Sequence, residues 1–162
     1  MNQFEAARVG NLEWFSNNEF DINAQDSNGD TVLILASWKG HTEIAFAIIE
    51  KGANLDLQDN WGTTALTCAS GHGHTEIAFA LIEKGANLDL QNKCGGTALT
   101  RASWNGHTEI TDAIESWKQT PRSLKYTIQM YIKKCNIDTS SVPHGLLQMN
   151  PLGKEINMGQ EF

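Results

Sequence analysis

Cysteine and long apolar runs are scarce in this sequence of 162 residues. The three cysteines form no spaced cluster, which argues against a disulfide framework and indicates a reduced, intracellular protein. No apolar run reaches the roughly 18 residues of a transmembrane helix, so we expect no membrane partner. The opening residues MNQFEAARVG lack the basic and then apolar pattern of a signal peptide. We therefore expect a cytoplasmic protein, or one of a host cytosol if a bacterium secretes it there.

Positive charge is the next deficit. Twelve lysine and arginine residues stand against 19 aspartate and glutamate residues, which gives a net charge of −7. An acidic chain is repelled by the phosphate backbone of DNA and RNA, so we expect no nucleic-acid partner.

Sequence motifs for catalysis and cofactor binding are also missing. The chain has no glycine-rich phosphate loop, no nucleophile elbow and no paired acidic residues in a catalytic arrangement. His41, His74 and His107 recur, but they lack the cysteine and carboxylate partners of a metal-binding pattern. We predict a protein without catalytic residues, cofactors or bound metal.

What the sequence does contain is an internal repeat. Gly29, Gly62 and Gly95 are spaced by 33 residues (62−29 and 95−62). The segment HTEIAFAIIEKGANLDLQ at 41–58 recurs at 74–91 with one conservative change. Self-similarity at such a period is the signature of a repeat architecture, in which each unit buries its apolar face against its neighbours.

Each unit is predicted to hold a turn and two short helices. In the unit at 26–58, Thr31 follows a glycine turn and suits the N-cap of a first helix, which should end at Gly40. A second helix should begin near Thr42 and end before Gly52, where a helix C-cap favours a positive φ. The corresponding residues of the next two units are Thr64, Gly73, Thr75 and Gly85, then Thr97, Gly106 and Thr108.

The second helix places apolar residues on one face. Ile44, Ala47 and Ile48 follow helical spacing, so we expect them in the core. Phe46 and Phe79 fall on the outward side, where their small alanine neighbours favour partial packing over a second binding stripe.

This order of turn, helix and antiparallel helix resembles the ankyrin repeat, over roughly residues 2–117. The resemblance implies an all-α solenoid of about four helix-turn-helix units, in which residues 2–25 form a degenerate N-terminal cap that faces water. The usual Thr-Pro-Leu-His has lost its proline and histidine in all three full units. The fourth unit departs further, with Arg101 where the two units before it have leucine and cysteine. We expect an ankyrin-repeat domain at 1–118 and C-terminal helices at 119–162.

Ankyrin repeats bind partners through their turn tips and the inner face of their first helices. Mapped onto matching positions, this surface comprises Ser27, Asn28, Asp30, Trp38, Lys39, Asn60, Trp61, Thr63, His72, Lys93, Cys94, Gly96, Trp104 and Asn105. Three of the five tryptophans fall there, and tryptophan is a preferred hot-spot residue of interfaces. The alternative is that each tryptophan lies against the next repeat, because large aromatic side chains are buried on average.

After the repeats, the segment PRSLKYTIQMYIKKC resembles the start of a SOCS box, a module that follows ankyrin repeats in one family of ubiquitin-ligase substrate receptors. The resemblance implies that Leu124, Ile128 and Ile132 form an apolar helix stripe that binds elongin C. Val142 and Pro143 match the cullin-contacting segment of that module imperfectly. The alternative is that the same stripe packs on the last repeat as a cap, because helix stripes are more often core than docking surface.

Together, the two resemblances imply an adaptor that binds a target protein through its repeats and recruits elongin B, elongin C and a cullin through its tail. Its mechanism would be proximity between target and ligase, without bond chemistry in this chain. The alternative is a stand-alone scaffold or inhibitor, which in a translocated bacterial protein would be an effector.

Overall fold

The computed structural model describes residues 1–120. The predicted elongin and cullin contacts of the tail lie outside these described residues. Within them the secondary structure consists of α-helices and turns, with no strand. The helices are α1 (Gln3–Val9), α2 (Leu12–Asn17), α3 (Val32–Lys39), α4 (Thr42–Glu50), α5 (Ala65–His72), α6 (Thr75–Glu83), α7 (Ala98–Trp104) and α8 (Thr108–Gln119). The prediction of an all-α chain is confirmed for this part.

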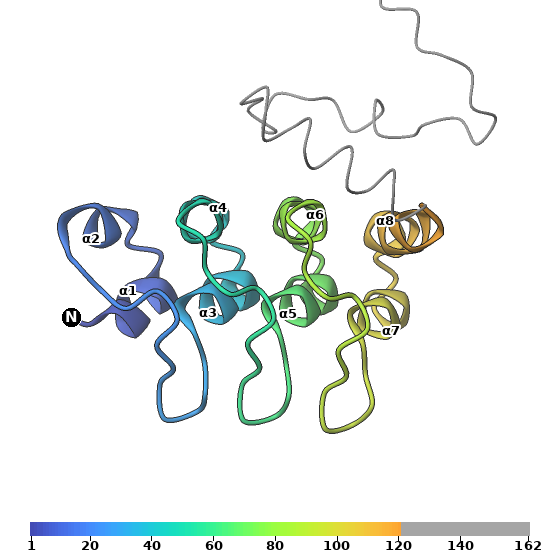
Figure 1. The fold of residues 1–162 in the computed structure, drawn as a ribbon, viewed down its shortest axis with the longest axis horizontal. Helices are drawn as coiled ribbons and strands as arrows, with labels where there is room; N and C mark the ends of the chain where they lie inside the picture. Colours follow the sequence, from blue (N-terminus) through green and yellow to red (C-terminus); the bar gives the residue numbers. More distant parts are fainter. Residues whose placement is uncertain (121–162) are drawn as a thin grey trace, which may run out of the picture. The chain divides into compact units, whose positions relative to one another are not determined.

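These helices form two parallel rows (Figure 1). The first helices of the units, α1, α3, α5 and α7, contact one another in sequence, and α2, α4, α6 and α8 do the same in the second row. Three long turns project on the far side of the first row and precede α3, α5 and α7. This stacking of helix pairs confirms the predicted solenoid.

The predicted helix boundaries follow from caps that each unit repeats. Thr31 Oγ1 accepts a hydrogen bond from the backbone N–H of Ile34 at 3.1 Å, and the equivalent Thr64 does the same for Thr67. In the last unit, Thr97 and Thr100 bond reciprocally as a capping box. Thr67 and Thr100 therefore supply polar contacts at the motif position where histidine is usual, whereas the first full unit has Ile34 there. Helix α7 ends one residue earlier than predicted, at Trp104, although Gly106 keeps its left-handed conformation.

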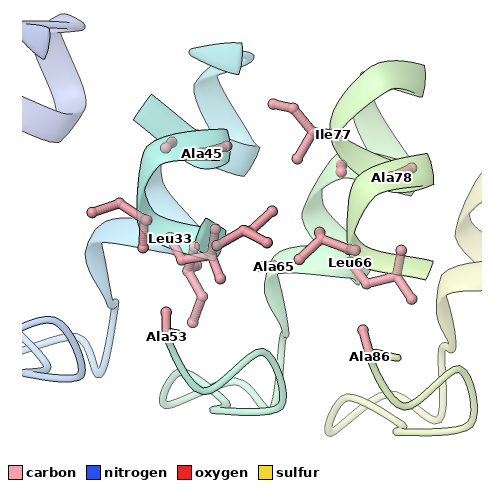
Figure 2. Close-up of a cluster of buried hydrophobic side chains, with 14 of the residues drawn as sticks. Leu33, Ala45, Ala53, Ala65, Leu66, Ile77, Ala78 and Ala86 are labelled. Carbon is pink, nitrogen blue, oxygen red and sulfur yellow. The ribbon is translucent and has the colours of Figure 1, made fainter. Parts of the chain in front are cut away.

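The core lies between the two rows and between neighbouring units. Figure 2 shows leucines of the first helices meeting residues of the second helices and of the turns. In α4 the buried residues are Ile44, Ala45, Ile48 and Ile49, whereas Ala47 is only half-buried. The prediction for Ala47 was wrong because the buried stripe runs along adjacent pairs of residues and leaves Ala47 at its edge. The two outward phenylalanines are half-buried, in keeping with partial packing.

Contacts that recur once per unit hold the stack together. The ring of His74 lies so close to Gly40 of the preceding unit that an added Cβ there would come within 2.5 Å of it. His74 Nε2 also lies 3.3 Å from the carbonyl oxygen of Trp38. In the turns, Gln58 Nε2 donates to the carbonyl oxygens of Gly62 and Gln91. The repeated histidines therefore join one unit to the next.

The last unit presents a different environment. Leu99 is half-buried, although the leucines at the same position of α3 and α5 are fully buried. Ser103 is exposed, and among the described residues no atom would lie within 4 Å of a Cβ added at Gly106. The face that a further repeat would cover is thus open in this part of the chain. None of the helices between residues 1 and 120 is long and apolar enough to cross a membrane.

Candidate protein-binding surface

The inner surface consists of the exposed side of α3, α5 and α7 together with the turns that precede these helices. Its tryptophans remain accessible, with 45% of Trp38, 57% of Trp61 and 79% of Trp104 exposed. Burial of these side chains against the next repeat is therefore incomplete. Trp38 and Trp104 occupy the same position in α3 and α7, and α5 has Gly71 there.

Trp38 is held in place by its neighbours. Its indole N–H donates a hydrogen bond to His72 Nε2 at 3.1 Å. Because an indole can only donate, His72 carries its proton on Nδ1, which lies 3.0 Å from the carbonyl oxygen of Cys68. The Lys39 ammonium lies 4.3 Å from the centre of the Trp38 ring, within cation–π range. These contacts fix the orientation of an exposed aromatic side chain before any partner binds.

Trp61 is presented by a rigid turn. Asp59 Oδ1 accepts hydrogen bonds from the backbone N–H groups of Trp61 at 2.8 Å and Thr63 at 2.7 Å. The carbonyl oxygen of Trp61 accepts from the backbone N–H of Lys93 in the next turn at 2.8 Å. The Asn60 amide reaches back to the carbonyl oxygen of Ser27 at 3.0 Å. The three turns are thereby linked side by side.

Asp30 on this surface and Cys68 in α5 have altered acidity. Burial, with added repulsion from Asp26 and Asp59, raises the pKa of the Asp30 carboxyl from 3.8 to about 6, although Arg8 opposes the shift. Burial raises the pKa of the Cys68 thiol to about 12, so this cysteine stays protonated at neutral pH. A protonated, desolvated thiol is a poor nucleophile.

Replacing Asp30 by asparagine is expected to stabilise the protein at neutral pH. Because the pKa is higher in the folded chain, the carboxyl favours folding below about pH 4 and loses that contribution as the pH rises through about 6. We expect Asp30→Asn to gain about 1 kcal/mol at pH 7.5, a value reduced from the full linkage energy because water screens a half-exposed group. Urea unfolding of both proteins at pH 7.5 and pH 3.5 tests this, and an equal difference at the two pH values would contradict it.

The structure exposes most of the residues that the sequence assigned to this surface. The exposed residues are Ser27, Asn28, Trp38, Lys39, Asn60, Trp61, His72, Lys93, Cys94, Trp104 and Asn105, and the half-buried ones are Asp30 and Thr63. Gly96 is buried, so its assignment to the surface was wrong. The cause is Asn92, whose side-chain oxygen accepts the Gly96 N–H at 2.8 Å and covers it.

Sequence reasoning missed one pair of residues on this surface. The guanidinium of Arg101 in α7 lies against Gly71 in α5, where an added Cβ would come within 3.3 Å of Arg101 Nε. The sequence marked the residue but not the contact, because it shows only that arginine replaces the leucine and cysteine of the earlier units.

Comparison with known proteins agrees with the architecture. The family model described as Ankyrin repeats (3 copies) matches residues 4–92 and again residues 33–116. A search of curated proteins found no match. The two matched ranges together span most of the chain and coincide with the stacked helix pairs. The chain therefore belongs to the ankyrin-repeat family.

Proposed function

We propose that the inner surface captures a protein target, with Trp38, Trp61 and Trp104 as its main contacts. Ankyrin repeats support a role in protein–protein interaction. The observation that carries the proposal is the substantial exposure of all three tryptophans on this surface. Large exposed aromatic side chains are costly to leave in water and are enriched at interface hot spots. The remaining predicted contacts are Lys39, Asn60, Thr63, His72, Lys93 and Asn105.

The mechanism of such a protein is occupancy or proximity. A rigid array of stacked units binds one partner, and any second module then acts on that partner at raised effective concentration. The family assignment supports an interaction role, and we propose no reaction catalysed by this chain. An isolated scaffold or inhibitor would act by occupancy alone, and a bacterial effector could work in the same way inside a host cell.

Replacing each tryptophan by alanine is expected to weaken target binding by roughly 2 kcal/mol, or about 30-fold in Kd. The target is first identified by mass spectrometry of proteins captured from cell lysate and then titrated in purified form. Leu12→Ala is the matched control, because Leu12 is an exposed apolar residue in α2, outside the inner surface. Unfolding of the three variants, with normal binding by their folded fraction, would make these tryptophans structural.

We further propose that the chain is a ubiquitin-ligase adaptor with two parts, the repeats at 1–118 and a tail at 119–162. In this proposal the tail recruits elongin B, elongin C and a cullin. The support is the resemblance of 121–135 to a SOCS box and its position directly after the repeats. In that resemblance Leu124, Ile128 and Ile132 bind elongin C, and Val142 with Pro143 contacts the cullin. The competing proposal is that the same stripe caps the open face of the last repeat.

Leu124→Ala separates these two roles of the tail. In the adaptor it should abolish binding of purified elongin B–elongin C in calorimetric titration while the melting temperature stays unchanged. In a cap it should open a cavity and cost about 2–5 kcal/mol of stability. No binding by the wild-type chain at tens of micromolar, together with a lower melting temperature for the variant, would reject recruitment.

A further inference from the structure

Charge is segregated between the two rows of helices. The inner helices α3, α5 and α7 contain no aspartate or glutamate, in a chain whose net charge is −7. Their cationic side chains are Lys39 and Arg101. The second-row helices of the same units hold the acidic residues Glu43, Glu50, Glu76, Glu83, Glu109, Asp112 and Glu115. The helical part of the inner surface is therefore locally cationic on an acidic protein.

Arg101 is the cation best placed to contact a partner. Its guanidinium lies over Gly71, where an added Cβ would be 3.3 Å from Nε and 3.4 Å from Nη2. Gly71 occupies the helix position that carries Trp38 in α3 and Trp104 in α7, so the charge is placed between two exposed indoles. The side chain is half-buried, which restricts its motion and reduces its hydration.

Among residues 1–120, the Arg101 side chain forms no ion pair and donates no hydrogen bond. Asp30, Asp59 and Arg101 all act electrostatically on the Cys68 thiol: the two acids raise its pKa and Arg101 lowers it. Neither acid forms an ion pair with Arg101. One Asp59 oxygen is already occupied by two backbone N–H groups of its turn. Within residues 1–120, the N–H donors of this half-buried guanidinium therefore have no acceptor.

From this arrangement we infer that Arg101 binds a single aspartate or glutamate side chain of the target, flanked by apolar residues that contact Trp38 and Trp104. This rests on the proposed function and specifies the partner's chemistry. A guanidinium donates two parallel hydrogen bonds to a carboxylate, which makes Arg101 a selective donor site for an acidic side chain. A tract of several acids fits less well, because Asp30 and Asp59 on the adjacent turns would repel the additional charges.

A displayed library of random 12-residue peptides provides the test. Peptides are selected on the intact chain and counter-selected on a Trp38→Ala/Trp104→Ala double variant. An enriched peptide is then synthesised in its acidic form and with glutamine or asparagine in place of the acid. Arg101→Leu is the matched variant, because leucine occupies the equivalent position in α3. Thermal melting confirms that each variant is folded.

We expect the acidic peptide to bind wild-type protein at least about tenfold more tightly than its amide form, with the difference lost in Arg101→Leu. Gly71→Leu should also abolish the preference, because its side chain takes the place of the guanidinium. Equal binding of both peptide forms, or full affinity of the acidic peptide for Arg101→Leu, would overturn the inference and leave the tryptophan surface intact. If no peptide is enriched, or if the enriched peptides bind the Trp38→Ala/Trp104→Ala double variant equally well, the result would count against the proposed function as well.

Discussion

Leu66→Asp is expected to unfold the repeat array at room temperature. Leu66 is 1% exposed in α5 and belongs to the core shown in Figure 2. A carboxylate there would lose its hydration without gaining a partner, at a cost of more than about 4 kcal/mol. This approaches the whole stability of a small domain. Because neighbouring units stabilise one another through their shared interfaces, the loss should spread along the stack.

Leu99→Asp is the matched control for Leu66→Asp. Leu99 stands at the same position of the last unit but is half-buried, so its carboxylate can reach water. We expect a loss of only about 1–2 kcal/mol there. Urea unfolding followed by circular dichroism at 222 nm measures both variants. An unchanged free energy of unfolding for Leu66→Asp, or an equal loss in the two variants, would contradict this expectation. It would show that burial by a following unit does not determine the cost of the substitution.

Gly73→Ala is expected to destabilise the array by about 2–4 kcal/mol. Gly73 ends α5 with φ near +74°, a left-handed conformation that costs other residues about 1 kcal/mol. Its Cβ would also come within 2.5 Å of the His107 ring from the following unit. That ring must move, and overpacking of this kind typically costs about 1–3 kcal/mol more.

Gly106→Ala separates the two costs in Gly73→Ala. Gly106 has the same φ near +74°, but among the described residues nothing lies within 4 Å of its added Cβ. This variant should therefore lose only the backbone contribution. Adding His107→Ala to Gly73→Ala should reduce the cost of the glycine change to that of Gly106→Ala. Equal melting of the Gly73 and Gly106 single variants would mean that the histidine contact has no net effect.

The two exposed indoles of the inner helices should differ as binding anchors. Trp38 is oriented by His72 and Lys39, so it loses little side-chain entropy when a partner binds. Trp104 is more exposed and forms no such hydrogen bond within the described part of the chain. The proposed carboxylate site at Arg101 would lie between a fixed indole and a freer one.

Much of the local structure was predictable from the sequence. The repeat of 33 residues aligned each N-cap threonine and each helix-ending glycine, and these groups determine helix boundaries through short-range hydrogen bonds and backbone conformation. The start of α4 at Thr42 and the left-handed Gly52 follow from the same local chemistry. The exposure of most residues assigned to the inner surface was also predictable, because their positions recur with the repeat.

Other features depend on how the units stack. The sequence indicated a buried Ala47, but packing between α4 and its neighbours buries Ala45 instead. Leu66 and Leu99 have equivalent sequence positions and different burial, because within residues 1–120 a further unit packs against Leu66 and none packs against Leu99. The repeat period aligns equivalent residues, whereas the rotation and rise between units decide which non-equivalent side chains meet. The bond from Trp38 to His72, and the placement of Arg101 over Gly71, were therefore decided by the tertiary structure alone.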